Sequence, residues 1–184
     1  MADRLAYALS CLLAPLVLLP AAARAGEIPA TVDAVLVPSY RVIEPGLAGA
    51  GQPSPEALAR LKQMGFRTVI NLRTEQEGAA QERPLIEAQG LRYVSVPVTP
   101  ATLSLADVEA VEKVLADPAA RPVLLHCASS NRVGAVWAVI QARKGRSLEQ
   151  AEAAGAAAGM RPAMQDAVRR LLVAPAPAVG SAKP

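Results

Sequence analysis

The chain has 184 residues, with 19 Lys and Arg against 16 Asp and Glu, which gives a formal net charge of +3. This charge is mild, and three Tyr, one Trp and one Phe offer no platform for base stacking, so the composition argues against a nucleic-acid partner. The length fits one domain with appended segments.

The first 25 residues have the pattern of a secretory signal peptide. Arg4 gives a charged start, an apolar run extends from about residue 5 to residue 19, and residues 23–25 form an A-x-A cleavage site. The apolar run is shorter than the roughly 20 residues that a spanning helix needs. We therefore expect cleavage after Ala25 and a periplasmic or secreted protein with no membrane span afterwards, rather than a retained membrane anchor.

Three further segments follow the signal peptide: a proline-spaced lead-in over 26–41, a domain over 42–173 and a disordered Ala/Pro tail over 174–184. Within the domain, cap residues and apolar spacing predict helices that alternate with short strands. The expected helices lie over 54–65, up to Gly90, from Ser104, over 133–144, from Ser147 and over 162–173, and the expected strands over 67–72, 91–98 and 122–125.

This alternation predicts a single-domain α/β fold with a central, mostly parallel sheet flanked by helices. The strand at 122–125 is entirely apolar, which is typical of the middle of such a sheet. Ligands of these sheets bind beyond the carboxyl ends of the strands. Cys127 follows this strand and precedes a helix, so the sequence places a candidate site there.

The segment HCASSNR combines groups that suit nucleophilic chemistry on an anion. The start of the following helix presents unpaired N–H groups and a positive dipole end, which bind anions and stabilise a thiolate at Cys127. Arg132 supplies a planar, two-pronged donor for oxyanion oxygens. The small or polar residues Ala128, Ser129, Ser130 and Asn131 can form the cradle. A buried, inert thiol is the alternative for Cys127, and a structural role is the alternative for His126.

The same segment resembles the active-site loop of the protein tyrosine and dual-specificity phosphatase superfamily, which reads H-C-x5-R between a strand and a helix. GAGQPSPEALARLKQMGFRTVINLR and GRSLEQAEAAG also resemble parts of bacterial dual-specificity-like phosphatases, so the resemblance covers roughly 42–172. By pattern the most similar subgroup is the beta-lactamase-hydrolase-like phosphatase domains. The resemblance implies a cysteine-phosphatase-like fold without metal or cofactor. It also implies Cys127 as nucleophile, Arg132 as oxyanion clamp, His126 as modulator of the thiolate and the backbone of 128–131 as cradle.

The chain departs from that pattern in three ways. Four residues rather than five separate Cys127 from Arg132. Val133 stands where the family usually has a Ser or Thr directly after the arginine, and Ser129 or Ser130 could supply the missing hydroxyl. The loop at 99–104, where the family carries its general acid, has no carboxylate.

Three carboxylates outside that loop are the candidate general acids. Asp107 is the nearest in sequence, although its spacing from Ser104 also predicts a helix capping box. Glu75 and Glu77 follow the strand at 67–72, where a solvated loop is the alternative reading.

Three functions are compatible with these residues. The first is a phosphatase that hydrolyses a phosphate monoester through a phosphocysteine on Cys127. The second is a rhodanese-like sulfurtransferase that carries a persulfide on Cys127, because a six-residue loop is similar to that of rhodaneses. The third is a non-catalytic anion-binding module. The partner is thus a phosphorylated or sulfur-donor substrate, whose identity the sequence leaves open.

Overall fold

The computed structural model describes residues 28–173, so the predicted signal peptide and the predicted tail lie outside the described residues. The strands are β1 (Arg41–Glu44), β2 (Leu47–Ala50), β3 (Thr68–Asn71), β4 (Arg92–Ser95) and β5 (Val123–His126). The helices are α1 (Pro55–Leu58), α2 (Glu82–Glu87), α3 (Leu105–Leu115), α4 (Asn131–Arg143), α5 (Leu148–Ala157) and α6 (Pro162–Val173). Short 3₁₀ turns lie at Glu75–Glu77, Ala79–Gln81 and Pro118–Ala120.

The five strands form one sheet in the order β1-β2-β5-β3-β4. β1 and β2 are antiparallel, whereas β2, β5, β3 and β4 all run parallel to one another. All four residues of β5 are buried, as expected for a strand in the middle of the sheet. The predicted α/β fold with a mostly parallel sheet is confirmed.

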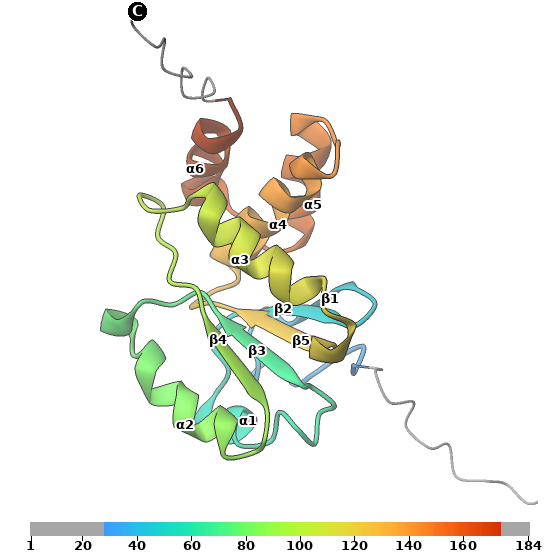
Figure 1. Cartoon of the computed structure of the whole chain (residues 1–184), viewed down its shortest axis with the longest axis vertical. Helices are drawn as coiled ribbons and strands as arrows, with labels where there is room; N and C mark the ends of the chain where they lie inside the picture. Colours follow the sequence, from blue (N-terminus) through green and yellow to red (C-terminus); the bar gives the residue numbers. More distant parts are fainter. Residues whose placement is uncertain (1–27, 174–184) are drawn as a thin grey trace, which may run out of the picture.

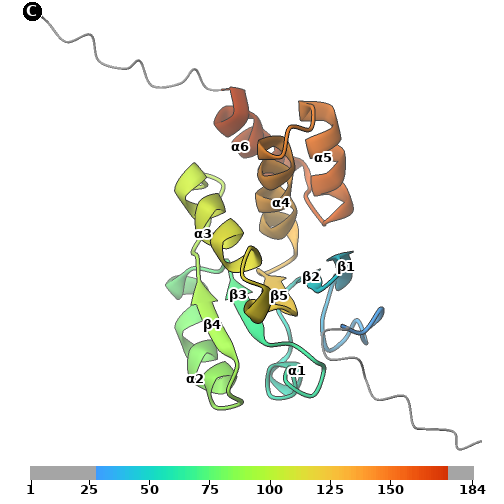
Figure 2. The same cartoon turned by 45° about the vertical axis from the view of Figure 1, so that its right-hand side comes forward.

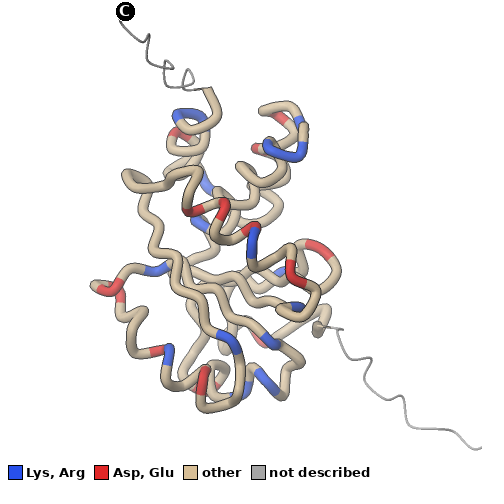
Figure 3. The backbone as a smooth tube through the Cα atoms, viewed as in Figure 1, with Lys and Arg blue, Asp and Glu red and all other residues tan. Residues whose placement is uncertain are grey.

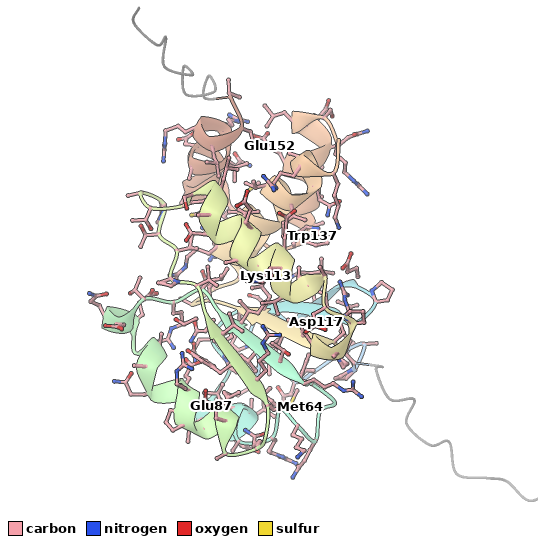
Figure 4. All side chains as sticks on the ribbon, viewed as in Figure 1. Met64, Glu87, Lys113, Asp117, Trp137 and Glu152 are labelled. Carbon is pink, nitrogen blue, oxygen red and sulfur yellow. The ribbon has the colours of Figure 1, made fainter. Side chains whose placement is uncertain are left out.

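Helices cover both faces of this sheet (Figures 1 and 2). Side chains of successive strand residues point to opposite faces. Val69 and Leu124 therefore pack with the α1 and α2 residues, and Ile70 and Leu125 pack with those of α3, α4 and α6. Glu152 of α5 (labelled in Figure 4) pairs with Arg169 of α6 at 2.6 Å, which links these two helices.

Several elements differ in length from the sequence prediction. The helix expected over 54–65 ends as α1 at Leu58, although the turns that follow still bury Leu61. The strand expected over 91–98 is regular only over β4, although the N–H groups of Val96 and Val98 still donate to the carbonyls of Asn71 and Leu72. The hairpin of β1 and β2 was not predicted as two strands, since Leu47–Ala50 consists mostly of small residues with weak strand preference.

The described surface carries charges of both signs. In Figure 3, basic and acidic positions are interspersed along the helices and loops on both faces of the sheet. Over residues 28–173, the structure contains no helix of the length and apolarity needed to cross a membrane.

Candidate active site

Cys127 lies directly after β5, at the edge where the parallel strands end. Its backbone N–H donates to the carbonyl of Ala50 at 3.3 Å, and the N–H of Gln52 donates to the carbonyl of Ala128 at 3.2 Å. These bonds fasten the start of the loop 127–130 to the end of β2. The side chain of Cys127 has no exposed surface, so its sulfur is shielded from solvent in this structure.

The loop ends at Ser130, the residue directly before α4, whose backbone has a left-handed conformation with φ 66°. Positive φ is uncommon for a residue other than glycine and often occurs at functional sites. The buried Ser130 Oγ donates to the carbonyl of Ala158 at 3.1 Å, which uses its only proton. α4 spans 13 residues, and its first N–H groups have no intrahelical acceptor and face the loop.

Arg132 is held by four hydrogen bonds. Its Nη1 donates to the carbonyl oxygens of Leu72 at 3.2 Å and Val98 at 3.0 Å. Nη1 and Nη2 donate to the two carboxylate oxygens of Glu77 at 2.7 and 2.6 Å. The hydrogen bonds to Glu77 raise the pKa of Arg132 against the effect of burial, and the negative charge of Cys127 raises it further. The guanidinium is therefore a fixed cation beside the cysteine.

Glu77 is the carboxylate that faces Arg132. The hydrogen bond from Arg132 lowers the pKa of Glu77 to about 2 against the effect of burial, and bonds from Thr74 add to the lowering. Glu77 is thus ionised at neutral pH and has no proton to donate while this pair is intact. The loop after β3 therefore contacts Arg132 through Glu77.

The other two candidate acids occupy different surroundings. Asp107 accepts hydrogen bonds from the N–H of Ser104 at 2.9 Å and from its Oγ at 2.7 Å, which forms the expected capping box. Glu75 is exposed. Neither side chain lines the cavity described next.

A cavity of about 400 Å³ lies beside the loop. Residues from the loops after β3, β4 and β5, from the start of α4 and from α6 line it: Thr74, Glu77, Thr99, Pro100, Ser129, Asn131, Arg132 and Met164. The structure therefore brings Ser129, Asn131, Arg132 and Glu77 together around one space next to Cys127.

A buried polar network lies behind the cysteine and centres on Glu82 of α2. Glu82 accepts hydrogen bonds from Gln52 at 2.8 Å, from Asn71 at 3.0 Å and from Arg73. Nε2 of His126 lies 3.2 Å from Glu82 Oε2, so the imidazole is directed to this carboxylate. Burial raises the pKa of Glu82, but His126, Gln52 and Arg73 together lower it more.

The sequence analysis missed Glu82. An acidic residue in the first turn of a helix is typical of a solvated surface, and no local signal distinguishes this one.

The matched family model is described as the "Beta-lactamase hydrolase-like protein, phosphatase-like domain" and covers residues 39–144. Curated beta-lactamase hydrolase-like proteins of Xylella fastidiosa are 32% identical over 119 residues, which is 61% of this chain. One from Agrobacterium fabrum is 32% identical over 102 residues, or 53% of this chain. The chain spans 27% of the length of the Xylella relatives and 23% of the Agrobacterium relative.

Solved structures share the fold. A DUF442 protein of Shewanella putrefaciens is 25% identical with a TM-score of 0.58, over 73% of this chain and 88% of that chain. Pseudomonas aeruginosa TpbA, solved in complex with phosphotyrosine, is 22% identical with a TM-score of 0.59, over 77% and 88%. The catalytic core of the yeast PP-IP phosphatase Siw14 is 15% identical with a TM-score of 0.56, over 71% and 84%.

Proposed function

Because the chain belongs to the family of beta-lactamase hydrolase-like, phosphatase-like domains, we propose that it hydrolyses a phosphate monoester through a phosphocysteine on Cys127. The resemblance found in the sequence is confirmed, and the fold is that of the cysteine phosphatases. One observation carries the proposal: Cys127 begins the loop that leads into α4, and the fixed guanidinium of Arg132 lies in the first turn of that helix, where unpaired N–H groups favour an anion.

The proposed reaction has two displacements at phosphorus. The thiolate of Cys127 attacks, so an S–P bond forms while the ester P–O bond breaks and its electron pair leaves with the alcohol oxygen. Water then attacks the phosphocysteine, which releases inorganic phosphate and restores the thiolate. In both steps Arg132 and the N–H groups of the loop stabilise the charge on the phosphoryl oxygens.

The proton for the leaving oxygen has no evident side-chain source. Among the described residues that line the cavity, Glu77 is the only one with a carboxylate. The hydrogen bond from Arg132 lowers the pKa of Glu77, so this carboxylate stays ionised. A general acid typically contributes about 10²–10⁴-fold to the rate. We therefore expect the enzyme to favour aryl phosphates, whose leaving oxygens need protonation less than those of alkyl phosphates.

The test is hydrolysis of 4-nitrophenyl phosphate by the full chain. Cys127→Ser is expected to abolish turnover, and Arg132→Ala to lower kcat/KM by about 10²–10³-fold, the usual effect of losing one oxyanion donor. Arg60→Ala is the control, because Arg60 is an exposed residue of the opposite layer that pairs with Glu56. Turnover by the wild type that equals the Cys127→Ser background on aryl and alkyl phosphates would refute the proposal.

The loop length favours sulfur transfer as a second candidate. Cys127 and Arg132 enclose four residues, which suits a smaller group than phosphoryl. In that reaction Cys127 attacks the outer sulfur of thiosulfate, the S–S bond of the donor breaks and sulfite leaves with its electrons. A thiol or cyanide then accepts the sulfur. Intact-mass measurement distinguishes the two functions, because this reaction adds one sulfur atom to the wild type and none to Cys127→Ser.

We also propose that residues 1–25 direct export to the periplasm or beyond the cell. The pattern of Arg4, the apolar run and the A-x-A site supports this proposal. Cell fractionation followed by N-terminal sequencing tests it. A mature protein that begins at Gly26 outside the cytoplasm is expected, whereas an intact N-terminus in the cytoplasm would refute it.

A further inference from the structure

The turn between α5 and α6, residues 158–161, forms an outer support for the loop that carries Cys127. Ser130 Oγ donates to the carbonyl of Ala158 at 3.1 Å, and the N–H of Arg161 donates to Asn131 Oδ1 at 2.7 Å. At Gly159, a Cβ would lie only 2.7 Å from Ser130 Oγ, so the two segments touch closely. This turn lies beyond the family match at 39–144, so the match does not account for it.

The side chain of Arg161 extends from this turn to the rim of the cavity. Its Nη2 donates to Oγ of Ser129 and, at 3.4 Å, to the carbonyl of the same residue. Ser129 and Asn131, the two residues that Arg161 contacts, both line the cavity, and Met164 lines it from α6. Arg161 is exposed, so its guanidinium borders both the cavity and solvent.

Within residues 28–173, no carboxylate pairs with Arg161, whereas two neighbouring arginines each have a carboxylate partner. Arg132 is paired with Glu77 through both carboxylate oxygens, and Arg73 is paired with Glu82. Over the described part of the chain, Arg161 has no carboxylate within ion-pair distance, and its Nε and Nη1 groups have no acceptor. These donors remain available for a ligand at the rim.

We propose that Arg161 binds a second negatively charged group of the substrate, close to the phosphoryl group that Cys127 receives. This inference rests on the proposed phosphatase function and adds a substrate class: phosphate monoesters with a carboxylate or a further phosphate near the ester. Because Arg132 shares its charge with Glu77 and faces the phosphoryl group, a second anionic group of the substrate needs a further cation, which Arg161 supplies at the rim.

Two aryl phosphates that differ in one charge test this assignment. 3-Carboxyphenyl phosphate carries the second anion, and 3-carbamoylphenyl phosphate has nearly the same shape without it. The carbamoyl group withdraws electrons at least as strongly as the carboxylate, so leaving-group chemistry alone does not favour the carboxylate. For the wild-type full chain we expect kcat/KM to favour the carboxylate by about fivefold, the effect of a partly exposed charge contact.

Three variants locate the effect. Arg161→Gln is expected to bring the carboxylate-to-carbamoyl ratio to about one, and Arg161→Lys to keep part of the preference, because the charge remains. Arg170→Gln is the matched control: Arg170 lies on α6, has no carboxylate partner over 28–173 and donates to the carbonyl of Pro100 at 3.1 Å. Arg170→Gln removes the same charge from the helix that follows Arg161 and is expected to keep the ratio of the wild type.

The outcomes separate this inference from the function it rests on. An equal preference in the wild type, an unchanged ratio in Arg161→Gln, or an equal loss in Arg170→Gln would overturn the role of Arg161. Turnover that depends on Cys127 would still support the phosphatase in each of these cases. If the wild type hydrolyses neither ester above the Cys127→Ser background, the proposed function fails and the inference falls with it.

Discussion

Glu77 and Arg132 form the ion pair that fixes the guanidinium of the site, and its strength depends on pH. Arg132 holds the pKa of Glu77 at about 2, below the ordinary 4.5 that applies in the unfolded chain. Glu77 thus stabilises the fold fully above about pH 4.5, and this contribution is lost as pH falls towards 2. We expect the wild type to lose unfolding free energy more steeply over this window than Glu77→Gln, which cannot titrate.

Glu75→Gln is the control for that measurement, because Glu75 is exposed in the same 3₁₀ turn. At pH 7, Glu77→Gln is expected to lower the unfolding free energy by about 1 kcal/mol, between the values for exposed pairs and for hydrogen bonds to charged groups. Glu75→Gln is expected to change it little. Urea unfolding at several pH values measures both. Parallel pH profiles for the wild type and Glu77→Gln would show that the pair contributes nothing.

At the residue scale, the sequence indicated the proposed nucleophile and the proposed oxyanion clamp, but not the residues that contact them. Cys127 and Arg132 could be identified because strand, loop and helix start are neighbours in the chain, and local chemistry defines an anion site there. The partners of that site are remote in sequence. From the sequence, Glu82 and Arg161 look like ordinary charged surface residues. Only the fold places Glu82 beside His126 and Arg161 beside Asn131.

At the scale of elements, α4 and α5 pack with almost no space between their backbones. A Cβ added at Gly134 would lie 2.1 Å from the N atom of Met160 and 2.4 Å from the carbonyl oxygen of Gly155. Alanine favours a helix by about 1 kcal/mol over glycine, but backbone atoms cannot move aside as side chains can. Gly134→Ala is therefore expected to destabilise the protein by about 1–3 kcal/mol or more.

Ala153→Leu is the comparison for Gly134→Ala, since it adds bulk at an exposed position of α5. Its expected effect is within about 0.5 kcal/mol. Thermal unfolding and activity should be measured together, because the segment that would be displaced, next to Met160, also carries Arg161. A Gly134→Ala protein as stable as the wild type would contradict the close packing of the two helices.

At the scale of the whole molecule, the alternation of helices and strands was sufficient to predict a mostly parallel sheet and the edge at which its strands end, although not the β1–β2 hairpin. The physical reason is that strand and helix patterns are local, and parallel strands end at a common edge. The covering of the site by α6 could not be predicted in this way. It depends on the turn at 158–161, whose contacts join residues about 30 positions apart.

Anion binding can be measured on the stability of the whole molecule, without assuming any reaction. A ligand that binds the folded chain at 100 times its Kd adds about 2.7 kcal/mol to the unfolding free energy. Saturating inorganic phosphate should then raise the Tm of the wild type by several degrees relative to chloride at equal ionic strength.

Two variants divide the contributions to that shift. Cys127→Ser leaves Arg132 and the N–H groups of the loop in place and is expected to keep the phosphate-dependent shift in Tm, whereas Arg132→Ala is expected to lose most of it. The same shift in Arg132→Ala as in the wild type would place the anion elsewhere. A phosphate-dependent shift without turnover of any phosphate ester or transfer of sulfur would identify the protein as an anion-binding module.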